Sequence, residues 1–130
     1  MNRTILLVGT AMGMLAIVLG AFAAHGLEKL VDAQAIDTFE TGVKYQMYHA
    51  LFLLFLGIWD GLPSKPKKIV FTLVLLGVVL FSFSIYLLAL NSLTSFDFKI
   101  IGFLTPIGGV LMILGWAVLA YKILKTKKKG

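Results

Sequence analysis

The chain has 130 residues, of which 59% are hydrophobic and 14% are charged, and its formal net charge is +6. This composition excludes an ordinary soluble domain, in which charged residues make up about a quarter of the chain, and it is typical of membrane proteins. The sequence contains no cysteine, which excludes disulfide bonds and thiolate metal sites.

Four apolar runs are long enough to cross a hydrocarbon layer of about 30 Å, which takes about 20 helical residues. They cover residues 5–24, 44–62, 69–90 and 100–121. We therefore predict an all-α integral membrane protein that forms one domain, a four-helix bundle whose helices alternate in direction.

The first apolar run carries small residues on one helical face: Gly9, Gly13, Ala16, Gly20 and Ala24. Small residues allow helices to approach closely in lipid. We predict that Gly9, Gly13 and Gly20 pack against another helix of the same chain, with a dimer interface as the alternative. The run also imitates a secretory signal peptide, with Arg3 before it and small residues near its end. We expect a retained helix, because the run is longer than the apolar core of a typical signal peptide, and cleavage is the alternative.

Residues 32–44, between the first two apolar runs, are amphipathic. Their apolar positions recur every four residues, with charged and polar residues mostly elsewhere. Asp32 is a predicted N-cap, because its side chain can accept a hydrogen bond from a free N–H of the first turn. We expect a short amphipathic helix that lies on or caps the outer membrane interface and continues into the second span.

Aromatic residues at both ends of the second span resemble the belts found at membrane interfaces, with Tyr45 and Tyr48 outside and Trp59 inside. This pattern places His49 about one helical turn below the outer interface. In the fourth span, Pro106 has no N–H to donate within a helix. We predict either a kink there or a helix that restarts with Thr105 as its cap, and we assign Gly108 and Gly109 to helix packing.

The basic residues predict the orientation of the chain. With four spans, nine of the 12 Lys and Arg residues fall on the side of the two termini and three on the other, so both termini should be cytoplasmic. The polybasic tail, residues 122–130, should attract anionic lipid at the cytoplasmic face through Lys122, Lys125, Lys127, Lys128 and Lys129. Nucleic-acid binding is not expected, because this charge follows a membrane helix directly and forms no folded basic surface.

Polar residues near the outer ends of the predicted helices suggest a shared cavity, because these ends meet in an antiparallel bundle. The candidates are His25, Glu40, Gln46, His49, Asn91 and Thr105. Glu40 and His25 are the expected partners of His49. We favour structural roles for both histidines: His25 can cap the last carbonyls of its helix, and His49 can bond to a neighbouring helix and fix its packing. A functional role in the cavity is the alternative.

The chemistry available to these residues is narrow. Two histidines cannot supply the three or four converging ligands of a zinc or copper site, and both lie at the same predicted edge, which does not suit haem ligation across a bundle. No serine, cysteine or threonine stands with a base in a recognisable catalytic motif. We therefore predict no metal, no cofactor and no catalytic activity.

Four ordered motifs resemble one known family. They are L-G-A-F-A-A-H-G-L at 19–27, Y-Q-M-Y-H-A-L at 45–51, F-S-F-S-I-Y-L-L-A-L at 81–90 and T-P-I-G-G-V-L-M-I-L-G-W at 105–116. The chain is similar to the small bacterial membrane proteins of the domain of unknown function family 423, the YwdK-like or UPF0382 proteins, which are related to transmembrane protein 256. The resemblance implies four spans in the inner or plasma membrane and no established activity. The family has glycine where this chain has Phe83, so no close helix contact is implied there.

Two functional hypotheses follow from these features. The first is a structural or interaction protein of the cytoplasmic membrane, which self-associates or supports a membrane-protein partner. The alternative is a carrier or binding protein for a proton, a small solute or a lipid, with its site in the polar cavity around His49. A membrane enzyme that uses a histidine base at the outer interface is a third class, and it lacks a supporting motif.

Overall fold

The computed structural model describes residues 2–126, and all regular structure in this part of the chain is helical. Asn2 begins the first helix, and Lys125 ends the last one. The elements in chain order are α1 (Asn2–His25), η1 (Leu27–Lys29), α2 (Ala33–Ile58), α3 (Ser64–Val78), η2 (Val79–Phe83), α4 (Ser84–Ala89), η3 (Asn91–Leu93), η4 (Phe98–Ile101) and α5 (Leu104–Lys125).

Three helical segments are long and apolar enough to cross a membrane: Asn2–Lys29, Ser64–Ala89 and Phe98–Lys125. The segment α2 is as long as these, with 26 residues, but charged and polar side chains fill its first half and lower its mean hydropathy. The predicted all-helical structure is therefore confirmed for the described residues, with three candidate membrane spans. The chain has four spans if α2 also crosses the membrane, and three if it does not.

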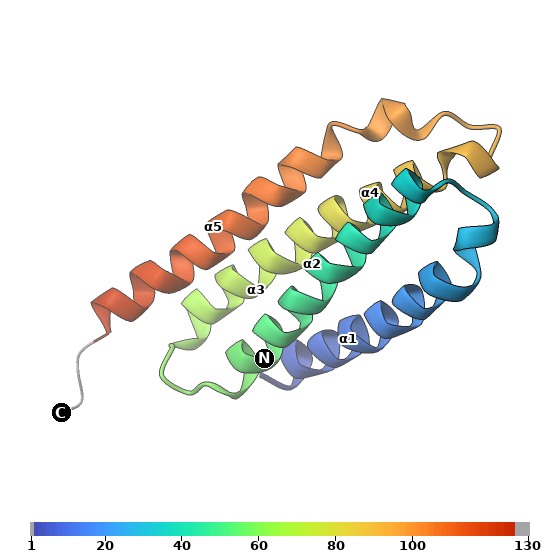
Figure 1. The fold of residues 1–130 in the computed structure, drawn as a ribbon. Coiled ribbons are helices and arrows are strands. Elements are labelled where there is room, and N and C mark those ends of the chain that lie inside the picture. The colour runs from blue at the N-terminus through green and yellow to red at the C-terminus, as the bar shows by residue number, and fades with distance from the viewer. Residues whose placement is uncertain (1, 127–130) are drawn as a thin grey trace.

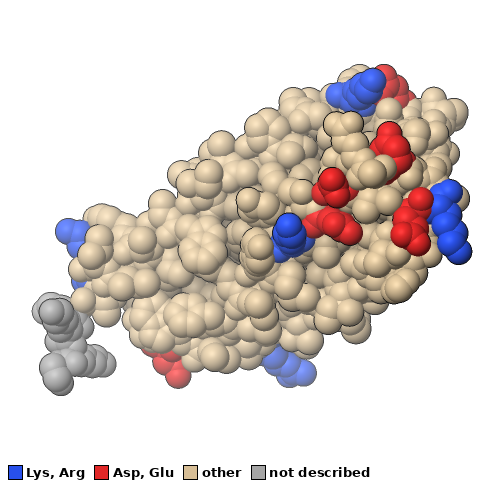
Figure 2. All heavy atoms as spheres, in the orientation of Figure 1, with Lys and Arg blue, Asp and Glu red and all other residues tan. Residues whose placement is uncertain are grey.

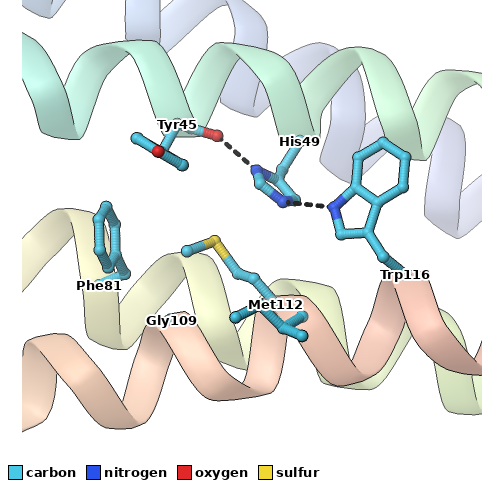
Figure 3. Close-up of a pocket in the computed structure, with 7 residues that line it drawn as sticks. Tyr45, His49, Phe81, Gly109, Met112 and Trp116 are labelled. Atoms are coloured by element: carbon cyan, nitrogen blue, oxygen red, sulfur yellow. Dashed lines mark hydrogen bonds between the residues drawn. The ribbon is translucent and has the colours of Figure 1, made fainter.

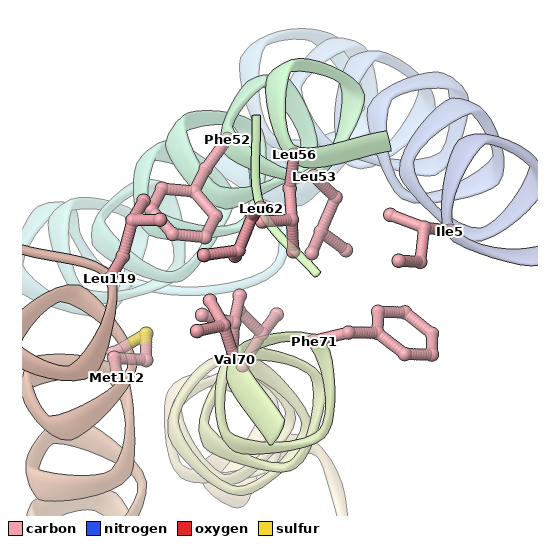
Figure 4. Close-up of a cluster of buried hydrophobic side chains, with 11 residues drawn as sticks. Ile5, Phe52, Leu53, Leu56, Leu62, Val70, Phe71, Met112 and Leu119 are labelled. Atoms are coloured by element: carbon pink, nitrogen blue, oxygen red, sulfur yellow. The ribbon is translucent and has the colours of Figure 1, made fainter. Parts of the chain in front are cut away.

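The long helices lie side by side and alternate in direction (Figure 1). Helix α1 packs mainly on α2, and α5 packs mainly on α3 and the adjoining turn η2, whereas α2 contacts α3, η2 and α4 and so joins the two pairs. A buried apolar cluster fills the space between them (Figure 4). Its residues come from all the long helices and include Ile5, Leu53, Val70, Met112 and Leu119.

Many large apolar side chains on α1 and α5 face outward, as expected for helices in contact with lipid rather than water. Examples are Ile17 on α1, which is 65% exposed, and Ile113 on α5, which is 67% exposed. Buried positions on these two helices are mostly small residues. Their packing therefore depends on close helix approach, and their outward faces are apolar.

Helix α2 begins where the sequence predicts, because Asp32 Oδ1 accepts a hydrogen bond of 2.8 Å from the N–H of Ala35. The amphipathic residues 33–44 are the first part of this helix and not a separate element. The helix ends at Ile58, before the predicted limit of residue 62. Trp59 turns to an extended conformation because Gly61 and Pro63 follow in the connection to α3.

The last helix restarts before Pro106 and does not kink at it. A turn of 3₁₀ helix, Phe98–Ile101, precedes α5, which begins at Leu104. Pro106 therefore lies in the first turn of α5, where a missing N–H breaks no intrahelical bond. The N-cap is Phe103 rather than the predicted Thr105, and no side chain caps this end. Asp97 caps the preceding 3₁₀ turn through the N–H of Lys99, at 3.0 Å.

The predicted packing glycines lie between helices of the same chain. A Cβ placed on Gly9 would lie 3.1 Å from the carbonyl oxygen of Ala50, whereas Gly13 and Gly20 leave ordinary contact distances to α2. Gly108 lies directly against the backbone of α3 and η2, and a Cβ there would be 2.7 Å from the Gly77 oxygen. Gly109 has more room, with 3.8 Å to the ring of Phe81.

Candidate functional site

A buried polar network crosses the bundle between α1, α2 and α4. Gln46, which is 1% exposed, donates from Nε2 to the carbonyl oxygen of Met12 at 2.9 Å. Its Oε1 accepts a hydrogen bond of 2.6 Å from the hydroxyl of Tyr86. Each polar atom of the Gln46 amide group thus has a partner on a different helix. Such a network fixes which helices meet and in which register.

A second set of hydrogen bonds surrounds η2, a π-helical turn between α3 and α4. The hydroxyl of Ser82, which is fully buried, donates to the carbonyl oxygen of Gly42 at 2.8 Å. The hydroxyls of Ser84 and Thr105 share a hydrogen bond of 2.5 Å between α4 and α5. Single π-helical turns often occur at functional positions of a helix. Here the π-helical turn contains Ser82, whose hydroxyl bonds to α2.

His49 bonds to α5 and not to the predicted residues Glu40 or His25. The indole N–H of Trp116 donates to Nε2 of His49 at 3.0 Å, and Nδ1 of His49 lies 2.7 Å from the carbonyl oxygen of Tyr45 (Figure 3). Because an indole nitrogen only donates and a carbonyl oxygen only accepts, Nε2 must accept and Nδ1 must carry the proton. The structure therefore assigns a neutral ring with both nitrogens satisfied.

The bond to Trp116 also gives the level of His49 along the bundle. Trp116 is 12 residues beyond Leu104, the first residue of α5, which is about 18 Å at the rise of an α-helix. His49 is therefore level with the middle of α5. The ring of Tyr45, which is 39% exposed, packs on Phe81 with a centroid distance of 4.9 Å. The depth of one turn below the outer interface stays a prediction.

A partly open groove lies beside this pair, between α2 and α5. Its volume is about 310 Å³, and its walls are mostly aromatic and aliphatic: Tyr45, His49, Phe81, Gly109, Met112, Ile113 and Trp116 (Figure 3). Both nitrogens of the one strongly polar ring are already bonded. The groove can accommodate an apolar group, and it offers little to a polar solute.

We predict that nitrogen NMR of the histidine-labelled protein will show His49 as the neutral Nδ1–H tautomer. The Trp116→Phe variant, which keeps an aromatic ring but removes the N–H, should shift the Nε2 signal of His49. Trp59→Phe, at the chain's other tryptophan, is the matched control and should leave that signal unchanged. A neutral Nε2–H tautomer in the unmodified protein would contradict the bond to Trp116.

The six predicted cavity residues do not line one cavity. His25 and Glu40 are exposed, Gln46 is buried inside the bundle, and His49 lines the groove beside α5. Asn91 lies in the connection after α4, where its side-chain oxygen accepts from the N–H of Phe98 at 2.7 Å. Thr105 bonds to Ser84. The prediction of one shared polar cavity is therefore corrected: these residues occupy separate positions, and Gln46, His49, Asn91 and Thr105 are hydrogen-bonded within the chain.

Comparison with known proteins places the chain in a family. The family model described as "Protein of unknown function (DUF423)" matches residues 19–109, which is more than half of the chain. The chain belongs to this family. The resemblance that the four motifs indicate is therefore confirmed.

Several UPF0382 membrane proteins align with almost the whole chain. A protein of Staphylococcus saprophyticus is 43% identical over 90% of this chain and 93% of its own length. YwdK of Bacillus subtilis is 34% identical, over 95% of this chain and 98% of its own length. The inner membrane protein YgdD of Escherichia coli is 35% identical over 99% of this chain and 95% of its own length. No solved structure matches the chain.

The DUF423 match contains most of the buried network but not the whole candidate site. Gln46, His49, Ser82 and Tyr86 all lie within the matched residues, whereas Trp116 lies beyond them. The relatives are described as membrane proteins, and the family as one of unknown function. The family assignment therefore establishes a membrane protein without an established activity.

Two residues of the site were not predicted from the sequence. Trp116 reads as an ordinary aromatic residue of an apolar helix, and Ser82 as a serine bonded within its own helix. Lys67, which the sequence shows only as one of the basic residues that predict the orientation, is 2% exposed and donates to the carbonyl oxygen of Trp59 at 2.6 Å. For Ser82 and Trp116, the one available signal was that both residues lie in apolar stretches of the sequence. A buried hydroxyl or indole N–H in such a stretch needs a hydrogen-bond partner, which another helix can supply.

The predicted lipid-headgroup lysines lie partly outside the described residues. Lys122 and Lys125 are in the last turn of α5, and their ammonium groups lie 5.8 and 5.6 Å from the ring centre of Tyr121. Both also line a shallow groove with the connection between α2 and α3. Lys127, Lys128 and Lys129 lie outside the described residues.

Proposed function

We propose that this DUF423 protein is a structural or interaction protein of the cytoplasmic membrane, with four spans and no catalytic role. The observation that supports this most strongly is the state of its buried polar groups. In residues 2–126, every buried side-chain nitrogen or oxygen has a hydrogen-bond partner within the chain. A carrier or an enzyme needs polar groups that remain available to a substrate, whereas these bond helix to helix.

The proposed fourth span is α2. Its second half exposes large apolar side chains, including Leu51, Phe55 and Ile58, as a lipid-facing helix does. Its first turns expose Gln34, Glu40 and Lys44, which suits the predicted amphipathic position at the outer interface. Together with the three apolar segments, α2 would complete a four-helix bundle.

The charge distribution supports an orientation with both termini in the cytoplasm. Acidic side chains gather at the end where α1 joins α2 and α4 joins α5 (Figure 2). Five of the six acidic residues belong to this end, and only Asp60 belongs to the other. Of the basic residues that the structure describes, six lie at the end of Asp60 and three at the acidic end. The excess of Lys and Arg is expected on the cytoplasmic side. The Escherichia coli relative is named an inner membrane protein, which supports a location in the cytoplasmic membrane.

Labelling of single cysteines tests both the span number and the orientation, because the chain has no cysteine of its own. We predict that an impermeant maleimide will label Asp37→Cys on intact cells and Lys68→Cys only after lysis. Both residues are exposed, and they flank the apolar half of α2. If α2 does not cross the membrane, the two sites will share one side. Labelling of Lys68→Cys alone would reverse the orientation.

A lipid-binding role through the groove beside His49 is the second candidate, because an apolar groove of about 310 Å³ lies level with the middle of α5. Native mass spectrometry of the protein and of His49→Ala tests it. A lipid that is bound to the protein and absent from the variant would favour this role. Identical spectra would leave His49 as a packing residue. The same spectra report whether the protein self-associates and whether anionic lipid is held at Lys122 and Lys125.

A further inference from the structure

A second and larger groove lies at the opposite end of the molecule from the chain termini, between the start of α2 and the connection from α4 to α5. Its volume is about 560 Å³. Two charged side chains of opposite sign line it, Asp32 and Lys99, together with the uncharged polar residues Gln34, Thr38 and Asn91. This polar lining distinguishes the groove from the apolar groove beside His49.

The groove lies where a membrane span ends. Leu88 and Ala89, which line it, are the last two residues of α4 and of the apolar segment Ser64–Ala89. The connection that follows exposes several large apolar side chains although it is not a spanning helix: Leu93, Phe96, Ile100 and Phe103, each between 46% and 70% exposed. Exposed apolar residues beside a lysine are typical of a segment that lies at the boundary of headgroups and acyl chains. This step rests on the proposed membrane position of the chain.

The two charges remain available to a ligand of complementary charge. Asp32 uses Oδ1 for the cap of α2, and its other carboxylate oxygen takes no further part in that cap. Lys99 bonds to Asp97 through its backbone N–H, so that bond leaves its ammonium group free. The N–H groups in the first turn of α2 that Asp32 does not cap can donate to an anion. One anionic and one cationic group can therefore bind side by side.

We propose that this groove binds the headgroup of a zwitterionic aminophospholipid. The phosphate lies at Lys99 and the first turn of α2, and the primary ammonium group lies at Asp32. Leu88 and Ala89 contact the start of the acyl chains. An anionic headgroup without an amine supplies no partner for Asp32, and a quaternary amine supplies no N–H to donate to its carboxylate.

Native mass spectrometry of the purified full chain tests the proposal, with phosphatidylethanolamine, phosphatidylcholine and phosphatidylglycerol that carry the same acyl chains. Phosphatidylethanolamine should bind most tightly. Asp32→Asn and Lys99→Gln should each weaken its binding about tenfold, the effect of losing one charge-assisted hydrogen bond. Asparagine is as good an N-cap as aspartate, so Asp32→Asn removes the charge and keeps the helix start.

Asp37→Asn and Lys44→Gln are the matched controls, because both residues are exposed on α2 and neither lines the groove. They should bind phosphatidylethanolamine like the unmodified chain. Equal binding of the three lipids, or an equal loss in all four variants, would overturn the proposal. Free phosphoethanolamine that binds as tightly as the lipid would also overturn it, since the ligand would then be soluble. The cysteine labelling described above is independent of these outcomes and tests the span number and orientation separately.

Discussion

Among alanine substitutions of the predicted packing glycines, Gly108→Ala should lower the free energy of unfolding most. The added Cβ would overlap the backbone N of Phe81 and lie 2.7 Å from the carbonyl oxygen of Gly77 and 2.9 Å from the carbonyl carbon of Leu80. These are backbone atoms of a helix, so they cannot move aside as a flexible side chain can. Overpacking of this kind costs about 1–3 kcal/mol, and we expect the upper end of that range.

Gly109→Ala is the control, one residue away on the same helix. Its added Cβ would meet the ring of Phe81 at 3.8 Å, an ordinary contact, so the free energy of unfolding should change by less than about 1 kcal/mol. The free energies can be measured by titrating the detergent-solubilised protein with SDS and following the fluorescence of its two tryptophans. Equal midpoints for the two variants would show that α3 and α5 do not approach as closely as the structure has them.

The helices were predictable because one physical signal determines them. A run of about 20 apolar residues can satisfy its backbone in lipid only as a helix. For α2 the signal was a cap, since the carboxylate of Asp32 satisfies an N–H of the first turn. The ends that depend on turns were less predictable. Residue 62 was too late for the end of α2, because Leu62 is apolar and buried but lies in the turn that follows the helix.

The pairing of polar groups was not predictable, since periodicity gives the face of a helix but not the residue that meets it. His49 and Trp116 are 67 residues apart in the chain, and Gln46 and Tyr86 are 40 apart. The expected partners of His49 were chosen for proximity along the sequence. The structure instead pairs His49 with Trp116 on another helix. A buried polar group needs a partner within the bundle, and the exposed carboxylate of Glu40 does not reach into it.

The least predictable role in the fold belongs to a lysine that joins three helix ends. Lys67 lies in the first turn of α3, and its ammonium group donates to the carbonyl oxygen of Trp59 at 2.6 Å and to Oδ1 of Asn2 at 3.1 Å. Trp59 follows the last residue of α2, and Asn2 begins α1. A cation at the C-terminal end of a helix also interacts favourably with its free carbonyls. The sequence shows three similar lysines here, and nothing in it marks the buried one.

Lys67→Met should therefore lower the free energy of unfolding by about 2 kcal/mol, the range expected for hydrogen bonds to a charged donor. Methionine has a similar length and keeps the apolar packing, so the loss reports the ammonium group. Asn2→Ala should cost less, because the shorter bond to Trp59 remains. The same SDS titration measures all of these variants.

Lys68→Met is the matched control, since Lys68 is the next residue of α3 and its side chain is exposed. It removes the same charge from the same end of the molecule and should change the free energy of unfolding by less than about 0.5 kcal/mol. Equal effects of the two substitutions would mean that Lys67 acts only through net charge. Because the partners of Lys67 come from α1 and α2, a specific loss at this position would show that one ammonium group holds the N-terminal helix pair to α3.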